Sequence, residues 1–110
     1  MDLMIGTFIG RARNELLIAE KLYQLSKEDK IKELLRVPQN EFFYSAVISH
    51  SYYAIFYSAK AILLTREVKT ASPEVHKKTY EEFEKYFVKT GILDVSLLEI
   101  YKEMIIKSDY

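Results

Sequence analysis

Apolar residues recur every three or four positions through the first quarter of the chain, while the charged residues fall between them. This period matches one face of an α-helix, so the segment is predicted to form one long amphipathic helix. The residues of the predicted buried stripe are Ile5, Phe8, Ala12, Leu16, Ala19 and Tyr23. Charged residues such as Arg11 and Glu15 lie off this stripe.

A short second helix is predicted directly after the first. Ser26 precedes Asp29 by three residues, which is the spacing of a capping box, where the serine hydroxyl binds a free amide of the first helical turn. The helix is expected to run through Leu35. It should stop at Val37, because the residue before a proline, here Pro38, is driven out of helical geometry.

The most apolar stretch spans residues 41–64 and follows Asn40, a residue type that caps helices well. Its apolar residues cover nearly the whole circumference of the predicted helix, whereas a surface helix shows one stripe. We therefore expect this helix to be surrounded by other helices or by a second subunit. Serines, His50 and Lys60 interrupt the stretch and make insertion into a membrane costly.

Two further helices are predicted in the C-terminal part. After a polar loop over residues 65–71, the sequence Ser-Pro-Glu at 72–74 is typical of a helix start with proline in the first helical position. Gly91 predicts a left-handed stop, and Asp94 or Ser96 is expected to cap the last helix. The predicted buried residues of these helices are Tyr80, Phe83, Phe87, Leu98, Tyr101 and Ile105.

These elements predict an all-α fold. Four main helices joined by short links favour an up-down four-helix bundle with a short extra helix between helices 1 and 2, built as one domain over residues 1–110. The helix over residues 41–64 is expected to lie in the centre. No stop signal follows Ile106, so the last helix is able to continue in a longer chain.

Composition narrows the possible functions. The 110 residues include sixteen basic and sixteen acidic residues, so no overall charge favours nucleic acid or an acidic membrane surface. The absence of cysteine excludes disulfides, thiol nucleophiles and thiolate metal sites, and fits a reducing compartment. Without a leader or a long apolar run, the chain is predicted to be cytoplasmic, with no membrane association.

Most catalytic motifs are missing. The three glycines form neither a dinucleotide-binding nor a P-loop pattern, and neither His50 nor His76 has the spacing to glutamate of a di-metal bundle, so no metal and no cofactor are expected. His50, Tyr53 and Tyr57 are spaced so that they share one helix face. Either they line a cleft, or His50 is held by a hydrogen bond in the core or at an interface. His76 and Lys77 are expected to be exposed, on a solvated face or as a phosphate contact.

Several segments resemble the HEPN family of small helical proteins. Residues 49–64, SHSYYAIFYSAKAILL, are similar to the family's signature helix, in which a YYA-x-F core precedes an AK-A-LL ending. His76 and Lys77 followed by residues 87–91, FVKTG, resemble its third helix. Residues 12–19 and the closing residues 108–110 also fit the family, so the resemblance covers most of the chain.

The resemblance implies a homodimer that works beside a minimal nucleotidyltransferase, often as a toxin–antitoxin pair. Many members are metal-independent ribonucleases that carry an arginine and, four to six residues on, a histidine in the last helix. Here Ile105 takes the arginine place and Tyr110 the histidine place, with Lys107 as the nearby cation. His50 lies where many relatives carry arginine. The missing pair removes charge stabilisation and proton transfer, which disfavours catalysis.

The sequence therefore favours a non-catalytic partner subunit of a nucleotidyltransferase. Two alternatives stay open: a ribonuclease with a degenerate site, using His50, Lys107 or Tyr110, and a subunit that binds a nucleotide or RNA. The expected ligand or partner cleft comprises His50, Tyr53, Tyr57, Lys60, His76, Lys77, Asp109 and Tyr110.

Overall fold

The computed structural model describes residues 2–108, and this part of the chain is helical without any strand. The elements are α1 (Leu3–Lys27), α2 (Asp29–Leu34), α3 (Tyr44–Leu64), α4 (Val75–Phe83), a π-helical segment (Glu84–Val88) that continues α4, and α5 (Val95–Ser108). The predicted all-α bundle with a short extra helix is confirmed.

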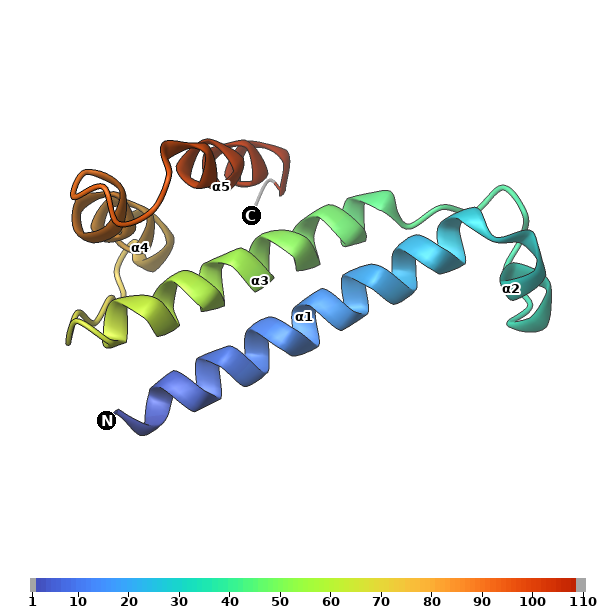
Figure 1. Cartoon of the computed structure of the whole chain (residues 1–110). Coiled ribbons are helices and arrows are strands. Elements are labelled where there is room, and N and C mark those ends of the chain that lie inside the picture. Colours follow the sequence, from blue (N-terminus) through green and yellow to red (C-terminus); the bar gives the residue numbers. More distant parts are fainter. Residues whose placement is uncertain (1, 109–110) are drawn as a thin grey trace.

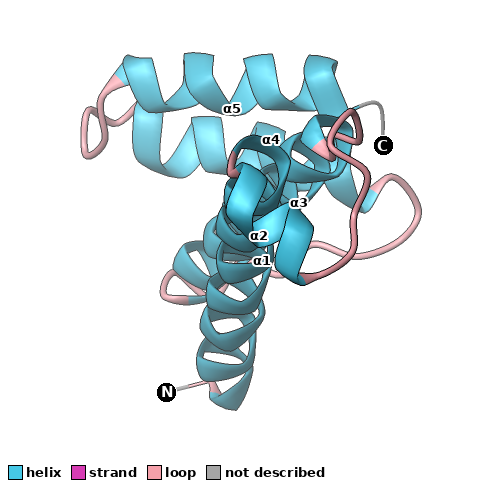
Figure 2. Cartoon of the chain, turned by 90° about the vertical axis from the view of Figure 1, so that its right-hand side faces the viewer, coloured by secondary structure: helices cyan, strands magenta, loops and turns pink. Residues whose placement is uncertain are grey.

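The long helices α1 and α3 run antiparallel, and α3 lies between α1 on one side and α4 with α5 on the other (Figure 1). Seen from the side, α4 and α5 extend across the direction of α1 and α3 instead of running alongside them (Figure 2). The central position predicted for the apolar helix is therefore correct. No helix of residues 2–108 is long and apolar enough to cross a membrane.

Aromatic side chains of α3 form the main core with residues of the C-terminal helices. Tyr52 and Leu63 are fully buried, and Phe56 and Ala59 are nearly so. Their partners on the other elements are Phe83, Phe87, Leu98 and Tyr101. The sequence had placed all four of these partners on buried faces. Phe8 of α1 packs in a second, smaller cluster against Ala61 and Leu64 of α3.

Ser26 does not cap the second helix, so that prediction was wrong. It lies within α1 and is fully buried, and its hydroxyl donates to the Leu22 carbonyl oxygen at 2.8 Å. The same hydroxyl oxygen accepts a hydrogen bond from the backbone amide of Phe43 at 2.8 Å. Glu28 occupies the N-cap position of α2 without a capping side chain.

The predicted start of α3 was also wrong. Phe43 is its N-cap, and residues 38–41 form a turn closed by a hydrogen bond from the Glu41 amide to the Pro38 carbonyl oxygen. Asn40 therefore caps nothing. Because the Phe43 amide is held by Ser26 of α1, the start of α3 is set by a contact between distant segments that a local capping pattern does not reveal.

The proline expected in the first position of α4 lies outside the helix, because α4 begins at Val75. Glu74 has a φ of 58°, in the left-handed region, so a right-handed helix cannot include it. Two other boundary predictions are confirmed. Gly91 has a positive φ of 79°, and the Asp94 carboxylate accepts a hydrogen bond from the Ser96 amide at the start of α5.

Candidate functional site: a basic aromatic cluster and an apolar groove

His50 is tied to α1 and does not point freely into a cleft. Its Nδ1 lies 2.5 Å from Oε2 of Glu15, and both side chains keep partial exposure. The sequence left open whether His50 lines a cleft or forms a hydrogen bond, and the structure shows a hydrogen bond between α3 and α1. Glu15 was not expected at the site, because its position off the apolar stripe indicated only a charged surface.

Tyr53 and Tyr57 follow His50 along α3 and pack among other rings. Tyr57 stacks on Phe8 of α1 with ring centroids 6.0 Å apart. Tyr53 meets the imidazole ring of His76 edge-on at 5.8 Å. These contacts join three helices, α1, α3 and α4, through residues that the sequence separates widely.

His76 is half-buried, which corrects the expectation that it is exposed. Its ring stacks on Phe56 at a centroid distance of 4.3 Å, and its Nδ1 lies 2.6 Å from the hydroxyl oxygen of the buried Tyr52. The first turn of α4 carries His76 toward α3, while the next residue, Lys77, points outward. Two consecutive residues of one helical turn thus differ, one packed and one solvated.

Two cations, Lys60 and Arg11, share the ring of Phe8. The Nζ of Lys60 is 4.8 Å from the centroid of Phe8 and 5.6 Å from that of Phe56. The guanidinium of Arg11 is 5.7 Å from the centroids of both Phe8 and Tyr57. Cations at such distances from ring faces are attracted by the quadrupole of the ring. The basic aromatic cluster, as named below, consists of Arg11, Lys60, His76, Phe8, Phe56 and Tyr57.

Two basic groups of this cluster have lowered pKa values. Burial lowers the pKa of Lys60, and the charge of Arg11 lowers it further. Burial likewise lowers the pKa of His76, with a second contribution from Lys60. Both shifts have the sign expected when burial and a neighbouring positive charge disfavour the charged form. Arg11 was missed by the sequence reasoning, and its one signal was its place three residues after Phe8.

We expect the depressed pKa of His76 to make stability depend on pH. In the unfolded chain the imidazole titrates near its ordinary value of about 6.5, so the unfolded state binds more protons than the folded state just below that pH. The free energy of unfolding should therefore fall as the pH is lowered from about 7.5 to about 5.5. Urea titrations of the wild type and of His76→Gln should show a smaller fall for the variant; equal falls would contradict the assignment.

Neither Lys77, which was expected in the cleft, nor Lys107, a catalytic candidate, joins the cluster. Lys77 Nζ lies 4.0 Å from Glu81, and Lys107 Nζ lies 2.9 Å from Glu103, both as exposed pairs within one helix. Asp109 and Tyr110 lie outside the described residues. Within residues 2–108, no group of three or more histidine, aspartate or glutamate side chains is placed to hold a metal ion.

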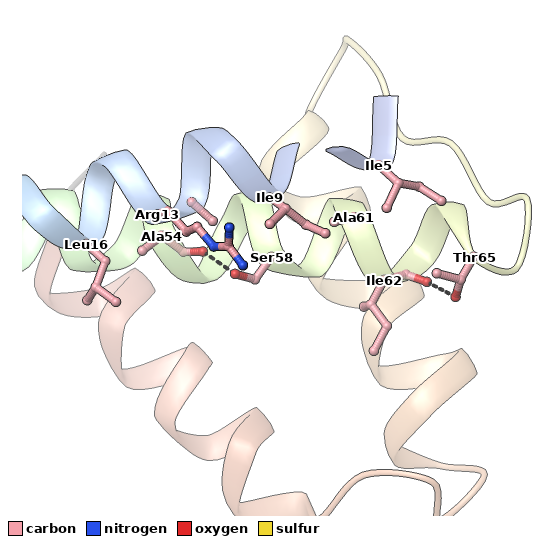
Figure 3. Close-up of a pocket in the computed structure, with 10 residues that line it drawn as sticks. Ile5, Ile9, Arg13, Leu16, Ala54, Ser58, Ala61, Ile62 and Thr65 are labelled. Carbon is pink, nitrogen blue, oxygen red and sulfur yellow. Dashed lines mark hydrogen bonds between the residues drawn. The ribbon is translucent and has the colours of Figure 1, made fainter. Parts of the chain in front are cut away.

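An apolar groove opens between α1 and α3, and no residue of the cluster is among its lining residues. Its first hollow measures about 430 Å³, and Figure 3 shows that its lining comes from both helices. The hydroxyl of Ser58 turns back to donate to the Ala54 carbonyl oxygen at 2.8 Å, so it presents little polarity to the hollow. The small residues that line it are Ala12, Ala54, Ser58 and Ala61.

A second hollow, of about 520 Å³, continues toward α5. It shares Leu16, Ala54, Ser58 and Ile62 with the first, so the two form one continuous depression, called the α3 groove here. Its outer walls are large apolar residues with much of their surface uncovered: Leu16 is 50% exposed, Leu97 44% and Ile100 51%. The exposed apolar surface of the groove thus comes chiefly from α1 and α5, on either side of α3.

Two proteins of Methanocaldococcus jannaschii are similar to this chain. It is 39% identical over 84 residues to "Putative toxin MJ0142", an alignment that covers 76% of this chain and 54% of that protein. It is 42% identical over 65 residues to "Putative toxin MJ0605", covering 59% of this chain and 43% of that protein. The chain spans about half the length of these relatives. It is thus an all-α protein related to proteins that are named as toxins.

No family model matches the chain, and no solved structure gives a significant match.

Proposed function

We propose that this chain is a non-catalytic partner subunit of a minimal nucleotidyltransferase, within a toxin–antitoxin type pair. The observation that carries the proposal is the α3 groove, an apolar depression beside the central helix whose walls include the exposed Leu16, Leu97 and Ile100. Apolar surface of this kind is typical of sites where another protein docks. The relatives' names support a toxin-like role, and the HEPN resemblance supplies the class of partner.

The shape of the groove favours an amphipathic helix as its occupant. The small side chains Ala12, Ala54, Ser58 and Ala61 allow a helix to approach closely, and the larger side chains on either side offer apolar contacts at helical spacing. Arg13 lines the same hollow and forms no ion pair with a carboxylate of residues 2–108. We therefore expect the partner helix to carry a carboxylate that faces Arg13.

A partner role without catalysis fits the chemistry of the described residues. The α5 segment Val95–Ser108 contains neither arginine nor histidine, the two groups of the ribonuclease motif that the HEPN resemblance implies. His50, the substitute base suggested by the sequence, is bound to Glu15. Incubation of the pure chain with labelled RNA should leave the RNA intact. If the wild type cleaved the RNA and the His50→Ala variant did not, this part of the proposal would be contradicted.

Self-association into a homodimer belongs to the same proposal. Its support is two exposed apolar residues near the ends of α5, Val95 at 56% exposure and Ile106 at 70%. This surface differs from the α3 groove, so a dimer still leaves the groove open for the partner. Light scattering of the pure chain should give the mass of two copies, and a monomer at micromolar concentration would remove the dimer from the proposal.

Association with the partner is tested by substitution in the groove. Ser58→Arg places a long charged side chain among apolar residues. The affinity of this variant for a co-expressed nucleotidyltransferase should therefore be at least about tenfold lower than that of the wild type. Thr90→Arg is the matched control, because Thr90 is also exposed and also bonds to the carbonyl oxygen four residues earlier, yet lines none of the hollows described above. Isothermal titration should show near wild-type affinity for the control. Equal affinities of the two variants would contradict docking in the groove.

A further inference from the structure

The ammonium group of Lys60 lies between α3 and α1, and Lys60 lines neither hollow of the α3 groove. Its Nζ is 4.8 Å from the centroid of Phe8 on α1 and 5.6 Å from that of Phe56 on its own helix. The side chain is half-buried, and no carboxylate of residues 2–108 forms an ion pair with it. The charge of Lys60 therefore lacks the opposite charge that would favour the protonated form.

Two features of this position favour the neutral amine of Lys60. Burial lowers the pKa of Lys60, and the positive charge of Arg11 lowers the pKa further. Arg11 reaches the same place from α1, where its guanidinium lies 5.7 Å from the centroid of Phe8. A lysine amine becomes an effective nucleophile when it is desolvated or lies beside another cation, and both conditions hold for Lys60.

A cavity of about 230 Å³ gives Lys60 room to carry a substituent. Lys60 is one of its walls, and the apolar walls are Met4, Phe8, Leu64 and Val68. Asp2 also borders the cavity, but its carboxylate accepts a hydrogen bond from the Met4 amide at 2.8 Å and lies 3.9 Å from Lys69 Nζ. A short apolar group attached to the nitrogen of Lys60 would therefore be able to bury its surface against these apolar walls.

We propose that Lys60 is a modification site at which the chain is acylated by a small acyl thioester. The neutral amine attacks the carbonyl carbon of the thioester, so that a carbon–nitrogen bond forms and the carbon–sulfur bond breaks. The proton lost by the nitrogen ends on the sulfur, and the products are an amide on Lys60 and a free thiol. The amide carries no charge, which removes the repulsion with Arg11 and leaves the acyl chain beside the apolar walls of the cavity.

Competition between two lysines of the same chain tests the site. The chain is incubated with the acetyl thioester of N-acetylcysteamine, a neutral donor that the positive charges do not attract, and mass spectrometry follows acetylation of each peptide. Lys60 should react at least about threefold faster than Lys107, an exposed lysine whose Nζ lies 2.9 Å from Glu103. The difference should disappear in urea, where both lysines are solvated. Equal rates in the folded chain, or a difference that persists in urea, would overturn the proposal.

The variant Arg11→Gln tests whether the neighbouring charge activates Lys60. Arg11 is exposed, so the variant should fold, and loss of its charge should slow acetylation of Lys60 at least about twofold without changing the rate at Lys107. Arg66→Gln is the matched control, because Arg66 is also an exposed arginine over an aromatic ring, that of Phe87. This control should keep the wild-type rate at Lys60. Equal rates at Lys60 in the two variants would overturn the proposed activation of the site.

Discussion

Leu63→Ala should lower the free energy of unfolding by about 3 kcal/mol, within the range of about 2–5 kcal/mol found for buried leucines. Leu63 has no exposed surface and packs within the main core, where α3 meets the C-terminal helices. Truncation removes apolar contacts and leaves a cavity that surrounding helices fill only partly. Urea denaturation followed by circular dichroism measures the change.

Leu34→Ala is the control for that measurement. Leu34 also lies in a helix, but 80% of it is exposed, so its truncation should change stability by less than about 0.5 kcal/mol. Alanine and leucine have similar helix propensities, so the comparison isolates burial. Equal effects at the two positions would mean that α3 is not the centre of the core.

Helical periodicity predicted the main elements because it depends on near neighbours in the chain. The confirmed caps have the same origin. Gly91 adopts a positive φ that glycine tolerates best, and Asp94 bonds an amide two residues away. The same periodicity correctly predicted which residues of the last helices are buried. Phe83, Phe87, Leu98 and Tyr101 all lie in the core.

The errors arose where a distant segment decides the outcome. Ser26 has the sequence context of a cap, yet it bonds the amide of Phe43, seventeen positions away. His76 follows a polar stretch, yet Phe56 of α3 covers one face of its ring. In both cases a local pattern competes with a tertiary contact that it does not encode, and the tertiary contact prevails.

The residues of the candidate site also fall into those that the sequence predicted and those that it missed. Spacing along one helix placed His50, Tyr53, Tyr57 and Lys60 near one another, because they share a stripe of α3. It could not supply Arg11 or Glu15, which reach that stripe from α1. Residues of opposite charge on one predicted solvated face thus take different roles: Glu15 binds His50, while Arg11 remains beside Lys60.

Two separate faces of the α1–α3 pair emerge from this arrangement. The α3 groove is lined mainly by apolar residues, whereas the basic aromatic cluster contains cations that lie over aromatic rings. Substitutions in the α3 groove should leave the cluster intact, since none of the cluster residues lines the groove.

Ser26→Ala should lower the free energy of unfolding by about 2 kcal/mol, the cost of leaving a buried polar group without its partner. The fully buried hydroxyl joins α1 to the start of α3 by accepting the hydrogen bond of the Phe43 amide. Alanine favours the helix slightly, so helix propensity opposes the loss and does not cause it.

Ser58→Ala is the matched control, because Ser58 makes the same bond to the carbonyl oxygen four residues earlier but is exposed. Chemical denaturation should show little change for Ser58→Ala. A Ser26→Ala chain as stable as this control would mean that the bond to Phe43 does not fix the junction between the two long helices.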